Sequence, residues 1–187
     1  MVRKRNLPNI LTVIRVILTG FIIYFLLQPD LASKFIALAI GLVAGISDLL
    51  DGMLARKYNW ISTFGKIADP TADKIFTLGI FITFSILRVF SWLWLIPIVL
   101  REIIVTGYRF KFVKENKKVA AGKSGKVKTF SQMILLVVMF VYLLLRDHSS
   151  YTSLTSVFQV IMYVLLVWTV YITIHSGVVF FRNAKKR

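Results

Sequence analysis

The sequence predicts an all-α integral membrane protein with six transmembrane helices and both termini in the cytoplasm. Of its 187 residues, 57% are hydrophobic, and the mean hydropathy is +0.75, which is too apolar for a soluble domain. Six apolar segments each approach the roughly 20 residues that a helix needs to cross a bilayer. Lysine and arginine gather in alternate connections between these segments, as expected of a multi-pass protein.

The first three expected helices cover residues 9–28, 34–57 and 69–90. The first follows a basic start without a small-residue cleavage site, so we expect a retained helix instead of a signal peptide. The second carries Gly41 and Gly45, whose spacing can form a close-packing face between helices. The third begins beside Pro70, which suits a first helical turn because its missing N–H has no partner there.

The last three expected helices cover residues 92–113, 127–146 and 154–181. Tryptophans lie near several predicted ends, where indole rings anchor at the membrane interface. No internal repeat or low-complexity linker divides the series. We therefore expect residues 1–187 to form one membrane domain.

The basic residues define the expected topology. They gather in segments 3–5, 56–66, 111–128 and 182–187, whereas segments 28–33, 88–92 and 146–151 carry few cations. The positive-inside rule then puts both termini and two basic loops on the cytoplasmic side of a cell (inner or plasma) membrane. This topology accounts for the net charge of +16 without a nucleic-acid partner, because the cations form no continuous stripe. Cysteine is absent, which excludes thiolate metal sites and cysteine nucleophiles.

Four aspartates inside the expected membrane helices are the main functional signal. They are Asp48, Asp51, Asp69 and Asp73, half of the eight acidic residues of the chain. Ionisable groups in spanning segments are costly and mark functional sites. Each pair shares a helical face, and the short connection between the helices can bring the pairs together. Oxygen donors without histidine or cysteine favour Mg²⁺, Mn²⁺ or Ca²⁺, and two such ions can stabilise attack on phosphorus.

Neighbouring residues fit a substrate site beside these carboxylates. Gly52 and Ala55 keep one helical face open, and Arg56 offers a bidentate fork for a phosphate oxygen. One structural alternative concerns Asp69, which precedes Pro70 and could serve only as a helix N-cap. Capping does not explain the other three aspartates, which lie within apolar runs.

These residues resemble the signature of the CDP-alcohol phosphotransferase family. The pattern is Asp-x-x-Asp-Gly-x-x-Ala-Arg-x8-Gly-x-x-x-Asp-x-x-x-Asp, and residues 48–73 match every defining position. The resemblance implies transfer of a phosphatidyl or similar group from a CDP-linked donor to an alcohol, with release of CMP. It also implies two divalent cations, Mg²⁺ or Mn²⁺, held by the four aspartates, with Asp73 as the general base, and a homodimeric protein. Its donor-binding residues would be Asn9, Thr12, Gly52, Ala55, Arg56 and Gly65.

Three further segments are similar to phosphatidylglycerophosphate synthases, namely residues 7–15, 101–109 and 125–132. The similarity implies CDP-diacylglycerol as donor and glycerol 3-phosphate as acceptor. Arg101, Arg109, Lys126 and Lys128 would bind the acceptor, since a phosphate taken below the membrane surface needs several charged donors. Alternatively, Arg101 forms a structural ion pair with Glu102, and the two lysines are ordinary flanking charges.

Other functions are compatible with parts of the pattern. A sister enzyme that makes cardiolipin or phosphatidylinositol phosphate shares the first segment. A divalent-cation transporter would use intramembrane carboxylates as its ion path, and a noncatalytic lipid-binding scaffold would need no turnover. A transporter would not require Arg56 or the small residues beside the acids, and CDP-dependent turnover by purified protein would exclude both the transporter and the scaffold.

Overall fold

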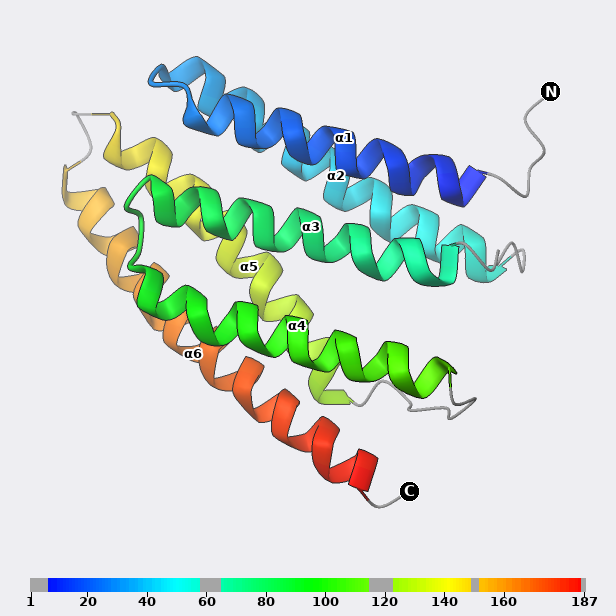
Figure 1. Ribbon diagram of the computed structural model, residues 1–187. Coiled ribbons are helices and arrows are strands. Elements are labelled where there is room, and N and C mark those ends of the chain that lie inside the picture. The colour runs from blue at the N-terminus through cyan, green and yellow to red at the C-terminus, as the bar shows by residue number, and fades with distance from the viewer. Residues whose placement is uncertain (1–6, 58–64, 115–122, 149–151, 186–187) are drawn as a thin grey trace. The chain divides into compact units, whose positions relative to one another are not determined.

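The described part of the chain is entirely helical. A computed structural model describes residues 7–57, 65–114, 123–148 and 152–185, and these ranges contain no strand. The helices are α1 (Leu7–Leu27), α2 (Leu31–Lys57), α3 (Gly65–Ile86), α4 (Trp92–Lys114), α5 (Lys123–Arg146) and α6 (Thr152–Lys185) (Figure 1). The all-α prediction and the number and order of the helices are therefore confirmed.

Helix α3 begins four residues earlier than the sequence suggested, at Gly65. Asp69 and Pro70 consequently lie inside the helix, so the interpretation of Asp69 as an N-cap is wrong. Pro70 is the sixth residue of α3, so its missing N–H removes one i→i−4 hydrogen bond just beyond the first turn. Helix α5 also begins earlier, at Lys123, which brings Lys126 into the helix.

The chain forms two compact units, Met1–Thr83 and Phe84–Arg187. In the first, α1 packs against α2 (Figure 1). Asp30 caps the start of α2, because its Oδ2 accepts a hydrogen bond from the Ser33 N–H at 2.7 Å. The hydrogen bonds from Ser33 lower the pKa of the exposed Asp30 carboxyl below its ordinary value.

Helix α3 approaches α1 closely at Gly79. A Cβ atom there would lie 3.2 Å from Ile23 Cδ1 and 3.5 Å from Thr19 Cγ2. A side chain at this position would therefore require Ile23 to shift by a few tenths of an ångström. Glycine fits this close contact between α1 and α3 without such a shift.

The second unit contains the last turn of α3 and helices α4 to α6. Helix α6 packs against both α4 and α5. The largest fully buried side chains of this unit come from several helices and include Phe84, Ile98, Leu135, Met139, Leu143, Met162 and Leu166. The rings of Phe84 and Phe140 meet edge to face, with centroids 5.0 Å apart.

The end of α3 is closed by a Schellman motif. The Val89 N–H donates to the Phe84 carbonyl at 2.9 Å, and the Arg88 N–H donates to the Ser85 carbonyl at 3.1 Å. Arg88 has a φ of 55°, the left-handed conformation in which this motif normally uses glycine. Arg146 of α5 adds a side-chain cap, since its Nη1 donates to the Leu87 carbonyl at 3.0 Å.

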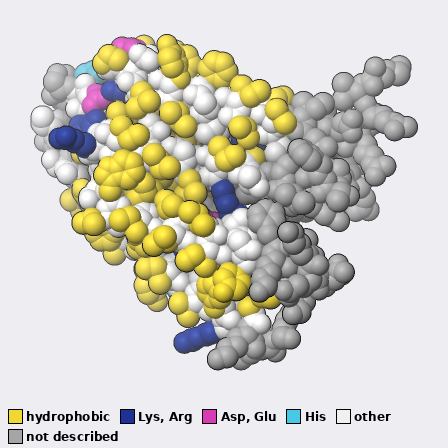
Figure 2. All heavy atoms as spheres, viewed as in Figure 1, with side chains coloured by type: hydrophobic (Ala, Val, Ile, Leu, Met, Phe, Trp, Pro, Cys, Tyr) yellow, Lys and Arg dark blue, Asp and Glu magenta, His cyan; other side chains and the backbone are white. Residues whose placement is uncertain are grey.

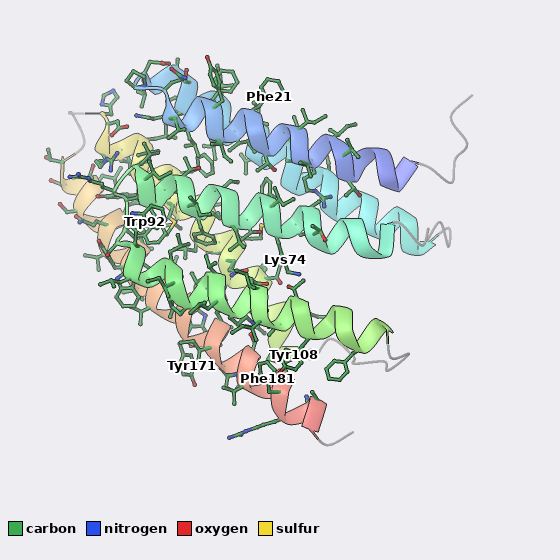
Figure 3. The ribbon with its side chains drawn as sticks, viewed as in Figure 1. Phe21, Lys74, Trp92, Tyr108, Tyr171 and Phe181 are labelled. Atoms are coloured by element: carbon green, nitrogen blue, oxygen red, sulfur yellow. The ribbon has the colours of Figure 1, made fainter. Side chains whose placement is uncertain are left out.

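Two described segments have the length and composition of membrane spans, Ser124–Arg146 and Thr152–Ala184; Thr12–Leu27 and Leu31–Ser47 are shorter apolar segments. Hydrophobic side chains cover much of the visible described surface (Figure 2). Phe21, Trp92 and Tyr171 are each half exposed and project outward from their own helices (Figure 3). Such extensive apolar exposure supports membrane association.

Candidate active site

The acidic signature lies on the end of α2 and the first half of α3. The backbone is helical from Asp48 to Arg56, so the register predicted for this part of the signature is confirmed. It is also helical from Gly65 through Asp73. The end of α2 and the start of α3 lie at the same end of the first unit (Figure 1). The side chains of residues 48–57 and 65–70 lie outside the described part, so their assignment to metals and donor remains a prediction.

Asp73 is the one aspartate of the signature whose side chain the structure describes. That side chain is 53% exposed, and its Oδ1 accepts a hydrogen bond from Arg15 Nη1 at 2.6 Å. Arg15 reaches it from α1 and is itself buried, with a side chain only 9% exposed. One carboxylate oxygen of Asp73 therefore has a fixed cationic partner, while the side chain still faces open space.

Arg15 is a site residue that the sequence reasoning did not assign. It belongs to a buried polar strip on α1 with Thr12 and Thr19. The Thr19 hydroxyl donates to the Arg15 carbonyl at 2.7 Å. The signal was available, because a lone arginine in an apolar helix calls for a functional explanation just as an aspartate does. Thr12 is buried as well, whereas the side chain of Asn9, the other donor-binding candidate on α1, is outside the described part.

The donor set suits a hard divalent cation. Carboxylate oxygens are the ligands that Mg²⁺ and Mn²⁺ prefer, and helical spacing puts Asp69 one turn before Asp73 on the same face. Among the side chains that the structure describes, no group of three or more histidine, cysteine, aspartate or glutamate residues gathers. Three of the four proposed ligands are outside that set.

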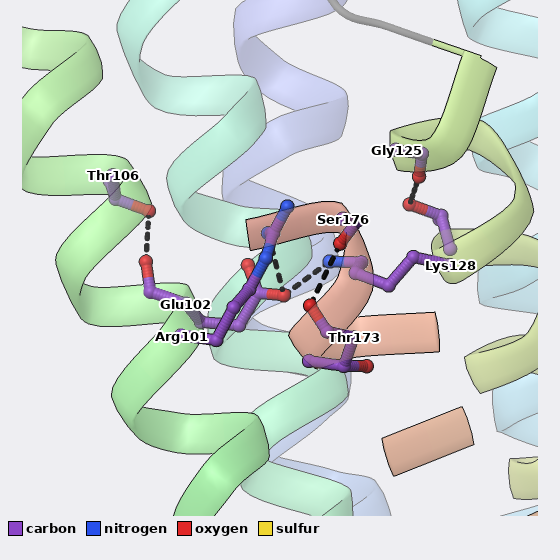
Figure 4. Close-up of polar contacts among 8 residues, drawn as sticks. Arg101, Glu102, Thr106, Gly125, Lys128, Thr173 and Ser176 are labelled. Carbon is purple, nitrogen blue, oxygen red and sulfur yellow. Dashed lines mark hydrogen bonds and ion pairs between the residues drawn. The ribbon is translucent and has the colours of Figure 1, made fainter. Parts of the chain in front are cut away.

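A second polar cluster lies in the unit formed by residues 84–187 (Figure 4). At its centre is Glu102 of α4, whose side chain is 6% exposed. Glu102 Oε1 accepts a hydrogen bond from Lys128 Nζ of α5. The same oxygen lies 3.3 Å from Arg101 Nη1. Two cations from two helices thus share one buried carboxylate oxygen.

The four predicted acceptor-binding residues differ in how far their side chains are buried. Arg101 and Lys128 are brought together, with side chains 11% and 9% exposed. Lys126 is exposed on α5, as expected of a flanking charge, and the side chain of Arg109 is outside the described part. The interpretation of Lys128 as an ordinary flanking charge is therefore wrong. The predicted pairing of Arg101 with Glu102 is present, and Lys128 shares it.

Several polar atoms of the described part of the second unit are buried without a hydrogen-bond partner. Gln132 Nε2, Thr169 Oγ1 and Thr173 Oγ1 have no hydrogen-bond acceptor or donor among the described residues. Gln132 follows Lys128 by one turn of α5, and both side chains are buried. Buried polar atoms in this state are uncommon in folded proteins and often mark a place for a ligand or water. Gln132 is the last residue of the segment 125–132, and no feature of the sequence assigned it a role.

Comparison with known proteins identifies relatives along nearly the whole chain. The family model "CDP-alcohol phosphatidyltransferase" matches residues 5–175. A CDP-diacylglycerol–glycerol-3-phosphate 3-phosphatidyltransferase of Rickettsia felis is 33% identical over 183 residues, covering 97% of each chain. Proteins of the same name from Escherichia coli (strain K12) and Haemophilus influenzae are 37% and 36% identical, over 70% and 71% of this chain and 74% of their own lengths.

Proposed function

Because the chain belongs to the CDP-alcohol phosphatidyltransferase family, we propose that it transfers the phosphatidyl group of CDP-diacylglycerol to glycerol 3-phosphate. The products are phosphatidylglycerophosphate and CMP, so the enzyme is a transferase of phospholipid biosynthesis. The observation that carries the proposal is the complete acidic signature, held in helical register at the end of α2 and the start of α3. The relatives named for this reaction support the choice of substrates.

On the donor side, Arg56 binds a diphosphate oxygen of CDP-diacylglycerol, since its planar fork matches phosphate geometry. Gly52, Ala55 and Gly65 leave room for the nucleotide, and Asn9 and Thr12 contact it from α1. Asp48, Asp51, Asp69 and Asp73 would hold two divalent cations, Mg²⁺ or Mn²⁺. When bound, such ions neutralise the diphosphate and make CMP a better leaving group.

The chemical step uses Asp73 as general base. Its carboxylate takes the proton of the acceptor hydroxyl, and the resulting oxygen attacks the phosphorus that carries the lipid. A new P–O bond to glycerol 3-phosphate forms as the bond to CMP breaks. Arg15 supports this role because its hydrogen bond to Oδ1 fixes the orientation of the Asp73 carboxylate.

On the acceptor side, a phosphorylated alcohol is favoured by the buried cations of the second unit. Arg101 and Lys128 supply two charged donors away from water, where a charge-assisted hydrogen bond to phosphate is strong. Arg109 and Lys126, which precede and follow the connection between α4 and α5 in the sequence, would add positive charge to the acceptor site. A free alcohol offers these cations no anionic group to bind.

We further propose that residues 1–187 act as one membrane domain with six spans, both termini in the cytoplasm and the active site on that side. The distribution of lysine and arginine supports the orientation, and the single family match across both compact units supports one domain. The bilayer then retains the lipid tails while the soluble acceptor arrives from the cytoplasm. A homodimer is proposed from family resemblance alone.

The test is an acceptor panel with purified protein, CDP-diacylglycerol and labelled CMP release. We expect turnover with glycerol 3-phosphate and at least ~100-fold less with glycerol, because loss of the phosphate leaves buried cations without their ligand. Preference for phosphatidylglycerol or inositol phosphate would replace this assignment by a sister enzyme. Absence of CMP release with every acceptor would favour the transporter or the scaffold.

A further inference from the structure

Glu102 occupies a position that fold stability alone does not explain. Its side chain is 6% exposed, and the two cations that it joins are almost as deeply buried. Moving three charges out of water is costly, and an apolar replacement of a buried ion pair is often equally stable or more so. Two cations from two helices are held on one buried carboxylate, away from water. Charged donors gathered in this way suit an anionic ligand.

The glutamate links the lysine to a second helix. Lys128 lies near the start of α5, five residues after Lys123, and its stem is long and flexible. The hydrogen bond to Glu102 Oε1 ties the ammonium group to α4. Arg101, anchored on the same oxygen, is held beside it (Figure 4).

The neighbouring helix leaves room for this arrangement. A Cβ atom at Gly177 of α6 would lie 3.3 Å from Arg101 Cγ, so a larger residue there would press on the stem of the arginine. Thr173, one turn before Gly177, and Gln132 on α5 each bring a buried polar atom that has no partner in the described part of the chain. Thr173 therefore brings a further polar group near the two cations (Figure 4).

We propose that Glu102 is a positioning residue for acceptor binding, holding Lys128 and Arg101 among α4, α5 and α6 where they bind the phosphomonoester group of the acceptor. This inference rests on the proposed function, which supplies glycerol 3-phosphate as the phosphomonoester. Glu102 touches the cations and acts through them. Its removal therefore weakens acceptor binding and leaves donor binding intact.

The experiment measures KM for each substrate, kcat and melting temperature in Glu102→Gln, Glu102→Asp and wild type. Glutamine keeps the size of the side chain but removes the charge that holds the two cations. We expect the KM for glycerol 3-phosphate to rise at least ~10-fold in Glu102→Gln, which corresponds to loss of one charge-assisted hydrogen bond. The KM for CDP-diacylglycerol and kcat at saturating acceptor should stay near wild type. Glu102→Asp retains the carboxylate and should show a smaller rise.

Thr106→Val is the matched control. Thr106 lies one turn further along α4, and its hydroxyl donates to the main-chain carbonyl of Glu102 without involving Lys128. Its removal should leave the KM for glycerol 3-phosphate unchanged. If this control reproduces the effect of Glu102→Gln, general disturbance of α4 explains the result and the inference fails.

Four results separate the possibilities. An unchanged acceptor KM in Glu102→Gln overturns the inference. A decrease in kcat and melting temperature together with a rise in both KM values also overturns it, because this pattern indicates a purely structural ion pair. If Glu102→Gln does not fold, the test uses Glu102→Asp. An unchanged acceptor KM in that variant also overturns the inference. A wild-type enzyme that releases no CMP with glycerol 3-phosphate overturns the proposed function itself.

Discussion

Replacement of Asp73 by asparagine tests the chemical step with little disturbance of the fold. The two side chains have nearly the same size, and the amide oxygen can still accept the hydrogen bond that Arg15 Nη1 donates to Oδ1. What the variant loses is the negative charge and the ability to take a proton. Because the Asp73 side chain is 53% exposed, water also compensates part of the lost ion pair.

The two effects differ in size. Removal of a general base costs at least ~100-fold in rate, or about 2.7 kcal/mol of barrier. The ion pair between Arg15 and Asp73 is screened by solvent on the aspartate side, and asparagine keeps a hydrogen bond to the buried arginine, so the variant should lose some stability without unfolding. Asp73→Asn should therefore be folded and inactive.

The assay compares labelled CMP release and melting temperature in detergent micelles. Asp30→Asn is the matched control, since Asp30 is an exposed aspartate at the cap of α2 and an asparagine oxygen can still accept the Ser33 N–H. This control should keep wild-type turnover. A wild-type rate in Asp73→Asn would refute the assigned role of Asp73, and a large drop in its melting temperature would show that the exposed carboxylate contributes mainly to stability.

Three further predictions concern the donor site, the divalent metal ions and the fold. Arg56→Lys should raise the KM for CDP-diacylglycerol roughly tenfold, because lysine cannot copy a bidentate fork; a defect confined to acceptor kinetics would remove Arg56 from the donor site. A chelator should stop CMP release and added Mg²⁺ or Mn²⁺ should restore it, whereas chelator-resistant turnover would contradict the carboxylate site. Arg88→Gly should raise the melting temperature by roughly 2 °C at unchanged turnover, because glycine accepts the positive φ of 55° without strain; a lower melting temperature would show that the arginine side chain is needed.

The helices were predictable because length and apolar composition determine them almost alone. The early start of α3 was not, since Pro70 and Asp69 together imitate a helix N-terminus while the helix in fact begins at Gly65. The contacts between side chains of different helices could not be predicted either. A spacing rule shows that Lys128 lies on α5, but only packing shows that it is buried against Glu102 rather than exposed like Lys126.

The two charged clusters of the described chain obey one physical rule. Each unit buries cations that pair with a carboxylate of the protein, Arg15 with Asp73 in the first and Lys128 with Glu102 in the second. Protein carboxylates offset part of the cost of placing these cations in an apolar setting. In the second cluster a substrate phosphate can share the cations with Glu102, because it also offers oxygen atoms and negative charge. A neutral alcohol offers no such charge, which favours a phosphorylated acceptor.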